Sequence, residues 1–382
     1  MVAQCWAHDD SGRMTPPSLT GETSVTSAEG RGASIEASAL VGALLRALGL
    51  AAVAVVLLVV LLTVTGQRTG DAMMALVSGA VGSWYAITSA TLVRAVPLAL
   101  AGLAVSLAFR AGILNIGAEG QLLAGAAAAT FATLAAPHLG VFIIPLLLAV
   151  GCVAGAAWAG IAAFLRQKLG VLEVISTIML NYVAFHTVGY LVRGPLQEPT
   201  GVFPQSFNID ARAHLPVIIP GTRLHLGFAL AVVIGVALWW WLRDRAGGFR
   251  LRAGGANARA AASAGRIDVV RTTTVAFLAS GAIAGLAGAT QLSGVTYSLY
   301  ETISPGYGYT AIAVALLARL NPLGVLVAAV MFGALEAGAN AMQRDAGVPE
   351  VLVSVVEALL ILLVLAADRW RTRGVRTTEA ST

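Results

Sequence analysis

The sequence RDRAGGFRLRAGGANARAAASAGRIDVVR, residues Arg243–Arg271, interrupts a chain whose flanking segments are mostly apolar. It holds seven of the chain's 24 basic residues. Charged groups at this density are too costly to place in hydrocarbon, so the apolar segments on either side belong to separate membrane helices. We call this stretch the polar island. It is either a solvated connecting loop or a surface on which a membrane protein meets a partner.

Composition places the polar island in a membrane protein. The 382 residues are 58% hydrophobic and 11% charged, whereas soluble domains contain about 25% charged residues. Apolar runs of about 18 residues or more, long enough to cross a bilayer as helices, recur along the chain. We therefore expect an all-α polytopic membrane protein. The net charge of +5 is expected to reflect topology, because basic residues accumulate on the inner side, and no nucleic-acid partner is expected.

The apolar runs predict about ten transmembrane helices between residues 38 and 370. Residues 1–37 are rich in Ser, Thr, Gly and Ala and are typical of a disordered tail. Residues 371–382 form a basic tail, and both tails are expected in the cytoplasm. The predicted spans are Leu44–Val64, Thr91–Phe109, Gln121–Ala136, Val141–Leu165, Val171–Val192, Leu226–Leu242, Thr272–Leu292, Tyr309–Ala318, Leu323–Met342 and Val351–Ala367.

The distribution of basic residues predicts that both ends of the chain lie inside (N-in/C-in). With ten spans and the N-terminus inside, the inner segments hold 18 basic residues and the outer segments hold 6. Cytoplasmic loops carry such an excess. This topology places the polar island, the 243–271 loop, in the cytoplasm and makes Arg193–His225 the largest external loop.

Polar residues interrupt the apolar pattern at Ala111–Gln121, AGILNIGAEGQ. Asn115, Glu119 and Gln121 are costly near hydrocarbon unless they face protein or water, and broken helices are tolerated where they line a cavity. The three side chains are therefore candidates for the path of a transported solute. The alternative is an ordinary short turn in which Glu119 caps the following helix.

A second polar stretch, Glu173–Tyr182, begins the fifth predicted span. Its residues Ser176 and Asn181 can point into the interior of a helix bundle and join the solute path. The alternative is that the hydroxyl groups bond back to their own helix, as Ser and Thr often do.

The segment Ser293–Tyr309 contains four tyrosines. They form either an aromatic belt at the lipid headgroups or a vestibule that stacks on a ring-shaped solute. Tyr307 is the path candidate of the second interpretation. Glu336 and Glu357 lie within apolar spans, where a carboxylate is a functional-site hypothesis by default, although either can be a buried structural group.

The residues give no sign of catalysis or metal binding. No group of His, Cys and Asp residues has the spacing of a metal site, and no Ser-His-Asp arrangement is evident. The single lysine, Lys168, is followed by leucine, whereas an ATP-binding P-loop requires Gly-Lys-Ser/Thr. We therefore expect that this chain is not an enzyme, has no catalytic residues and binds no metal or cofactor.

Within the polar island, one segment has the pattern of a short helix. Gly254 and Gly255 end the preceding segment, and Asn257 is a favourable cap for a helix that follows. A face of small residues then runs at helical spacing, with Arg259 and Arg266 on another face. The small face is formed by Ala258, Ala261, Ala262 and Gly265. Such a face permits close docking into a groove of a partner protein, and the alternative is a solvated basic loop facing anionic lipid.

With these motifs, the chain resembles the permease subunit of a bacterial ABC importer. The group in question serves branched-chain amino acids, simple sugars and nucleosides. Gly112–Gln121 is similar to the NIG-x-EGQ signature of that group, and Ser176–Tyr182, STIMLNY, is similar to its nucleoside branch. Gly254–Ile267 resembles the loop that docks on the ATPase. The resemblance extends from about residue 40 to residue 367 and implies a type II ABC importer-like permease bundle.

The resemblance also implies the partners and the location of this subunit. It would lie in the plasma membrane and hydrolyse nothing itself, because ATP and Mg²⁺ would bind to separate ATP-binding subunits. A second related permease and an external solute-binding lipoprotein would complete the transporter, alongside membrane lipid. Related loops often begin Glu-Ala-Ala, whereas Arg259 precedes Ala260-Ala261 here. The residues implied in coupling to the ATPase are Gly254, Asn257, Ala258, Ala260, Ala261, Ala262 and Gly265.

The resemblance favours nucleosides as the imported solute. Their rings and hydroxyl groups suit tyrosines and amides, although a simple sugar also fits. The remaining alternative is an ion-coupled secondary transporter, which Glu336 and Glu357 keep open and the polar island argues against.

Overall fold

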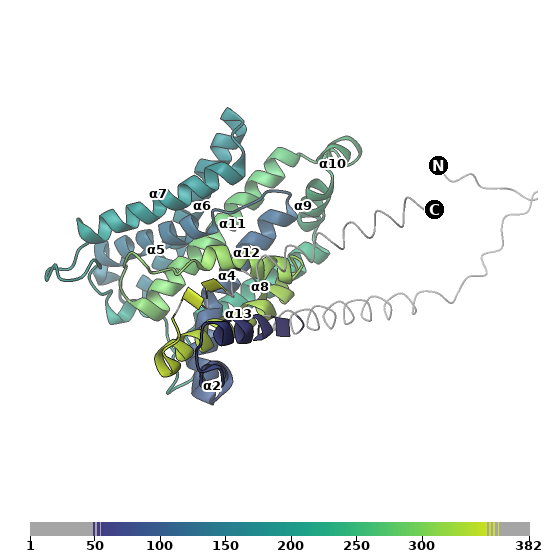
Figure 1. Ribbon diagram of the computed structural model, residues 1–382. Helices are drawn as coiled ribbons and strands as arrows, with labels where there is room; N and C mark the ends of the chain where they lie inside the picture. The colour runs from purple at the N-terminus through teal and green to yellow at the C-terminus, as the bar shows by residue number, and fades with distance from the viewer. Residues whose placement is uncertain are drawn as a thin grey trace, which may run out of the picture. The chain divides into compact units, whose positions relative to one another are not determined.

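The computed structural model describes residues 55–349 continuously, together with 49, 52, 53 and part of 351–358. These residues form helices and contain three isolated β-bridges but no named strand. Figure 1 shows the arrangement. The α-helices are α2 (Thr69–Val81), α3 (Trp84–Ala86), α4 (Leu92–Arg110), α5 (Ala118–Ala135), α6 (Ile143–Leu169), α7 (Glu173–Arg193), α8 (Gly227–Asp244), α9 (Ala246–Ala256), α10 (Ala258–Gly265), α11 (Val269–Gln291), α12 (Tyr307–Leu317) and α13 (Pro322–Ala346).

Four short helical segments of other types join them. Two are π-helical and extend neighbouring α-helices, and two are 3₁₀ turns in connections. The π-helical segments are η1 (Ile87–Thr91) and η4 (Leu292–Thr296), and the 3₁₀ segments are η2 (Pro137–Phe142) and η3 (Ala211–Ala213).

The predicted spans from Thr91 to Met342 each correspond to a helix. Within the described residues, six helices are long and apolar enough to cross a membrane, and three further apolar helices are shorter. The first predicted span is represented by Val55–Val64. Of the tenth span, Val351–Ala367, only part of 351–358 is described, and Glu357, residues 1–37 and residues 371–382 lie outside the described residues. Helix α2 was not predicted, because its apolar run of 13 residues is shorter than the bilayer requires.

Helices α5, α6 and α11 pack with their backbones in direct contact. A Cβ atom on Gly285 would overlap the carbonyl oxygen of Gly151, and one on Gly155 would overlap that of Gly281. The two glycine pairs that the sequence places four residues apart therefore face each other. Small residues permit this approach where lipid provides no hydrophobic drive. We call this contact, with Gly125 and Gly288, the glycine core.

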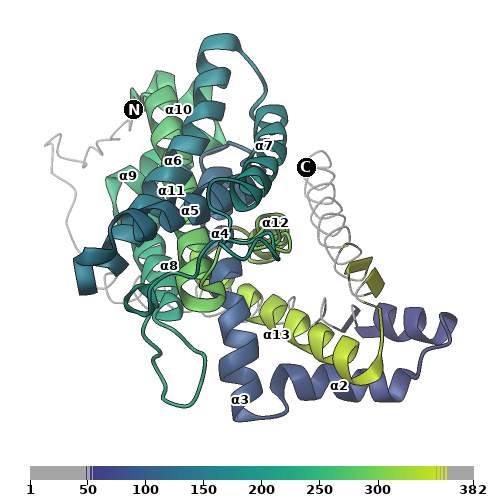
Figure 2. The ribbon, with the colours of Figure 1, turned by 90° about the vertical axis from the view of Figure 1, so that its left-hand side faces the viewer.

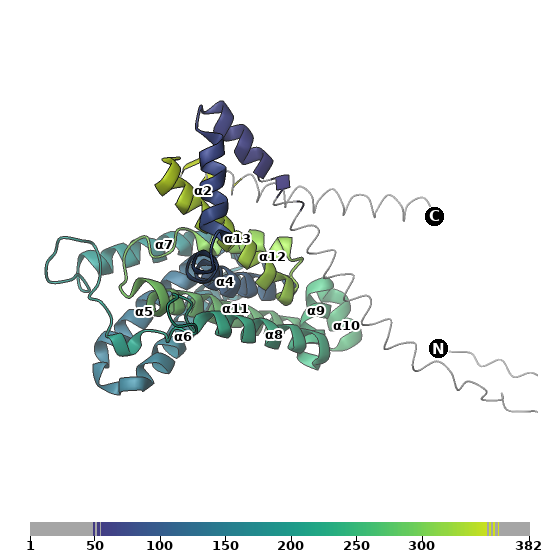
Figure 3. The same ribbon diagram turned by 90° about the horizontal axis from the view of Figure 1, so that it is seen from below.

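Helix α4 is buried along almost its whole length and lies between the glycine core and α13. It packs against α11 on one side and against α12 and α13 on another. Figures 2 and 3 show α2 lying beside α13, away from α6. Helices α9 and α10 lie beyond one end of α8 and α11 (Figures 1 and 3).

Candidate functional site

The break between α4 and α5 is held by two amides that satisfy each other. Nδ2 of Asn115 donates to Oε1 of Gln121 at 2.9 Å, and Nε2 of Gln121 donates to Oδ1 of Asn115 at 3.0 Å. Asn115 also donates to Oγ of Ser280 at 2.8 Å, and that hydroxyl donates to the carbonyl of Ala104. These buried side chains therefore join α4, α5 and α11 across the break.

Three more predicted path residues also bond to the protein. Oδ1 of Asn181 accepts from the amide of Gly120 at 2.8 Å, and its Nδ2 donates to the carbonyl of Ile116 at 2.9 Å. Oε2 of Glu119 accepts from the amide of Gly308 at 2.6 Å, in the first turn of α12 rather than in its own helix. Ser176 donates to carbonyls of its own helix. Asn181 and Glu119 therefore fix the backbone around the break, Ser176 bonds within α7, and none of the three lines the cavity described next.

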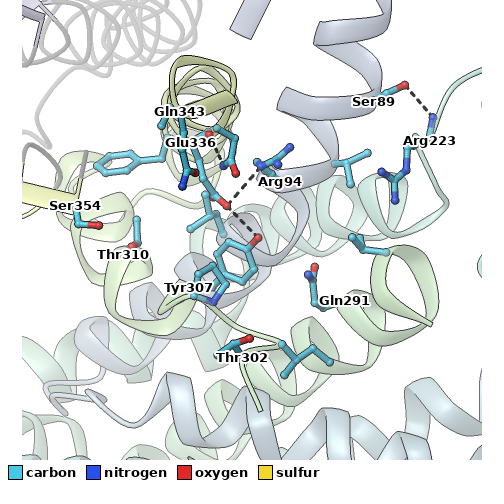
Figure 4. Close-up of a pocket in the computed structure, with 18 of the residues that line it drawn as sticks. Ser89, Arg94, Arg223, Gln291, Thr302, Tyr307, Thr310, Glu336, Gln343 and Ser354 are labelled. Carbon is cyan, nitrogen blue, oxygen red and sulfur yellow. Dashed lines mark hydrogen bonds and ion pairs between the residues drawn. The ribbon is translucent and has the colours of Figure 1, made fainter. Parts of the chain in front are cut away.

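A cavity of about 330 Å³ lies between α4, α11, α12 and α13. Tyr307, the remaining predicted path residue, is in its wall. Nε of Arg94 lies 3.5 Å from Oε1 of Glu336, and the Tyr307 hydroxyl donates to the same oxygen at 3.2 Å. Figure 4 shows these three side chains directed toward one another. We call the space the polar cavity, defined by Ser89, Arg94, Gln291, Tyr300, Tyr307 and Glu336.

Gln291 is the most informative member of the polar cavity. It is 5% exposed, yet its side-chain amide makes no hydrogen bond with any other described residue. Among the described residues, the side-chain atoms that are fully buried without a partner belong to Trp158, His214 and His225, so the Gln291 amide faces open space. The amide borders the cavity, where water or a solute can satisfy it (Figure 4).

Both π-helical segments border the polar cavity. Gln291 directly precedes η4, and Ser89 belongs to η1. Such segments inside α-helices frequently occur at functional sites. The Ser89 hydroxyl accepts from the amide of Arg223 at 3.0 Å, and Gln205 forms a bridge with Tyr300. The loop between α7 and α8 therefore helps to shape the cavity wall.

Of the residues that define the polar cavity, Tyr307 and Glu336 were named as candidates from the sequence, and Arg94 and Gln291 were not. Arg94 lies just inside an apolar run, where it was counted as an outer topological charge. A signal was available, because an arginine and a glutamate in separate apolar runs are both costly unless they pair. Gln291 lies at the end of another apolar run, where an amide needs a partner as well.

At the other end of the bundle, the polar island folds into α9 and α10. Oδ1 of Asn257 accepts from the amide of Ala260 at 3.0 Å, so the predicted cap is confirmed. The predicted small face is divided: Ala261 is buried, whereas Ala258, Ala262 and Gly265 are exposed, as is Ala260. Gly265 also borders a second cavity of about 720 Å³, which lies between α8, α9 and α11.

Helix α9 contacts the end of α4 directly. Gly254 is buried, and a Cβ atom on Gly255 would overlap the carbonyl oxygen of Arg110. Gly112, with φ of +78°, also lies against the backbone of Gly255. Nε of Arg110 donates to the carbonyl of Leu320 at 2.6 Å, in the turn between α12 and α13. The end of α4 is therefore held between the polar island and the α12–α13 turn.

Comparison of the chain with known proteins indicates one family. A family model described as the permease component of branched-chain amino acid transport systems matches residues 87–365. The glucose ABC transporter permease protein TsgB13 of Haloferax volcanii is 40% identical over 72% of this chain and 75% of its own length. The guanosine ABC transporter permease protein NupP of Bacillus subtilis is 37% identical over 84% of this chain and 91% of its own length. The guanosine ABC transporter permease protein NupQ of the same organism is 27% identical over 76% of this chain and 95% of its own length. The chain therefore belongs to the family of permease components of branched-chain amino acid transport systems.

Proposed function

We propose that this ABC transporter permease subunit of the plasma membrane forms the import path for nucleosides, and that the polar cavity is part of that path. The observation that carries the proposal is a cavity whose wall holds the side-chain amide of Gln291 together with the Arg94–Glu336 ion pair and Tyr307. A ring-shaped solute with hydroxyl groups would satisfy those polar groups. The names of the guanosine permeases support a nucleoside, and the name of the glucose permease makes a simple sugar the second candidate.

The energy for import would come from partner subunits. We propose an N-in/C-in bundle of about ten spans, which places the polar island in the cytoplasm beside an ABC ATP-binding subunit that holds ATP and Mg²⁺. A second related permease and an external solute-binding lipoprotein would complete the transporter. Two guanosine permeases named in one organism, NupP and NupQ, support a pair of different permeases.

The contacts of the polar island support a role in coupling. The exposed Ala258, Ala260, Ala262 and Gly265 would dock on the ATPase, and Asn257 would fix the start of the docking helix. Gly254 and Ala261 are buried and would transmit movement of the docked ATPase to the helix bundle.

From there, a continuous route leads to the polar cavity. The contact of Gly255 with Arg110 connects α9 to α4, and Arg94 lies 16 residues away on the same helix, or roughly 24 Å at the helical rise. We propose that Asn115, Glu119, Gln121, Ser176 and Asn181 hold the backbone around this route, and that Tyr307 contacts the solute.

Uptake by the complete transporter in proteoliposomes tests the function. We expect ATP-dependent accumulation of labelled guanosine that resists ionophores and stops when the partner ATPase loses its Walker lysine. Accumulation of glucose in place of guanosine would establish the second candidate. Uptake that survives loss of the Walker lysine and collapses with an ionophore would show an ion-coupled transporter instead.

A tryptophan on the docking helix tests the coupling. Gly265 is exposed, so Gly265→Trp should leave the protein folded, while the larger side chain separates the helix from the ATPase. We expect ATP hydrolysis to continue and uptake to fall to background. Ser263→Trp, on the other exposed face of α10, is the matched control and should retain uptake. Normal uptake in Gly265→Trp would show that this face is not a docking face.

A further inference from the structure

We infer that the polar cavity recognises the vicinal hydroxyl groups of the solute's sugar ring, through Arg94, Glu336 and Gln291. This inference rests on the proposed function and goes further, because it names the part of the solute that the permease recognises by hydrogen bonding. A nucleoside and a simple sugar share a hydroxylated ring and differ in what is attached to it.

The three side chains supply complementary hydrogen-bonding groups at one site. Glu336 contributes a carboxylate that accepts, and Arg94 contributes a guanidinium that donates. Gln291 contributes an amide that does both. Each hydroxyl of a diol donates one hydrogen bond and accepts others, so a diol needs acceptors and donors side by side. The juxtaposition of Arg94 with Glu336 at 3.5 Å meets this need.

The ion pair is accessible from the cavity. The side chains of Arg94 and Glu336 are 27% and 20% exposed, and both border the cavity. Nη1 of Arg94 donates to the carbonyl of Ala90 at 3.4 Å, and its Nη2 makes no hydrogen bond within the described part of the chain. A solute hydroxyl can therefore bind to the guanidinium while the ion pair stays intact.

The cavity also offers apolar surface to the ring of a solute. The aromatic rings of Tyr300 and Tyr307 border the same space and offer apolar faces to the carbon atoms of the ring. The charged groups of the lining are Arg94, Arg223 and Glu336, so the inferred recognition of the diol rests on hydrogen bonds at the ion pair and not on the net charge of the cavity.

The test compares guanosine with 2′,3′-dideoxyguanosine in the reconstituted complete transporter. Hydrogen bonds to charged groups are among the stronger ones, so we expect wild-type uptake to favour guanosine by about tenfold or more. The solute-binding lipoprotein can contribute to that preference. The informative quantity is therefore the change in the guanosine-to-dideoxyguanosine ratio in a permease variant with the same partners.

In Glu336→Gln we expect the ratio to fall toward one, because uptake of guanosine drops while uptake of the dideoxy analogue changes little. Glu173→Gln is the matched control: Glu173 also pairs with an arginine, Arg166, at 3.6 Å, but it lies away from the polar cavity. That variant should keep the wild-type ratio. If Glu336→Gln is absent from the membrane, Gln291→Met removes an amide of the same site at similar size and should lower the ratio as well.

The outcomes separate the inference from the proposed function. A wild-type ratio in folded Glu336→Gln, or in Gln291→Met where Glu336→Gln does not assemble, would overturn the inference while guanosine uptake remained. Equal losses for both solutes would assign the side chain a structural role and would also overturn it. If the wild type takes up glucose and no nucleoside, the proposed function fails, and the same variants are then compared on glucose and its deoxy analogues.

Discussion

The middle and the C-terminal end of α11 lie in regions of opposite character. Along its middle, Gly281 and Gly285 bring backbones into contact with α6, and space for even a methyl group is absent. At its C-terminal end, Gln291 and η4 border a cavity of about 330 Å³ that contains an ion pair. The glycine core gains its stability from dispersion and close packing. The polar cavity leaves the hydrogen-bonding groups of its wall facing open space.

This difference indicates that one part of α11 serves rigid packing and another part borders a cavity. Interlocked backbones resist sliding, so α5, α6 and α11 are expected to move as one body. The polar cavity lies where that body meets α4, α12 and α13. Substitutions should therefore affect the free energy of unfolding most in the glycine core and least in the polar cavity. The following predictions are ordered by that effect.

The largest effect is expected for Gly285→Val. The new side chain would overlap the carbonyl of Gly151 and the backbone of Gly155, which no rotamer relieves. We expect a loss of at least about 3 kcal/mol, the upper end of overpacking costs, seen as absence of a monodisperse peak in size-exclusion chromatography in detergent. Gly160→Ala is the control, because its Cβ would lie 3.4 Å from Leu278 in ordinary contact. A folded Gly285→Val protein would show that the glycine core is not rigid.

An intermediate effect is expected for Asn115→Leu, at the break between α4 and α5. The change leaves the buried Gln121 amide without its partner and removes the donor to Ser280. A buried polar group left unpaired costs about 1–3 kcal/mol, so thermal unfolding in detergent should shift to lower temperature. Thr130→Val removes a hydroxyl that donates to its own helix and should lower the unfolding temperature less. Unchanged unfolding with loss of uptake would return Asn115 to the solute path.

A smaller effect is expected on acidification, through His225. Burial lowers the pKa of His225 to about 4 from its ordinary value of 6.5, and the neighbouring Arg223 adds to the shift. The unfolded chain therefore binds a proton first, and stability falls as the pH drops from 6.5 toward 4. Between pH 7.5 and 5.5 we expect a loss of about 1 kcal/mol. His225→Gln should reduce the change in unfolding temperature over that range, and a change as large as that of the wild type would contradict this account.

Local features of the fold could be predicted from the sequence. Apolar runs placed the helices from Thr91 to Met342, because the length of a hydrophobic segment is a property of that segment alone. The spacing of Gly281 and Gly285, four residues apart in the sequence, is likewise a local signal of close helix packing. Asn257 was identified as a cap because the capped amide of Ala260 is three residues away.

The partners of polar side chains could not be predicted in this way. Asn115 meets Ser280 across 165 residues, and Glu119 meets Gly308 across 189. Nothing near either residue specifies those contacts. Glu336 was identified from its position in an apolar run, but its pairing with Arg94 exists only in the folded bundle. The polar residues of the NIGAEGQ stretch were candidates for the solute path because of their motif. The side chains that border the polar cavity lie elsewhere in the chain.

The smallest effect on stability, and a clear effect on function, is expected for Tyr307→Phe. The variant loses the hydrogen bond from the hydroxyl to Glu336, whose pairing with Arg94 remains. Water in the cavity can replace the hydroxyl, so unfolding should change by less than about 0.5 kcal/mol, as for substitutions away from packed contacts. Uptake per folded molecule should fall by about tenfold, because a hydrogen bond to a charged group that orients Glu336 is lost. Tyr190→Phe, exposed on α7, should change neither quantity. A large fall in unfolding temperature with normal uptake would show that the polar cavity contributes to stability much as the glycine core does, and would remove the distinction between the middle and the C-terminal end of α11.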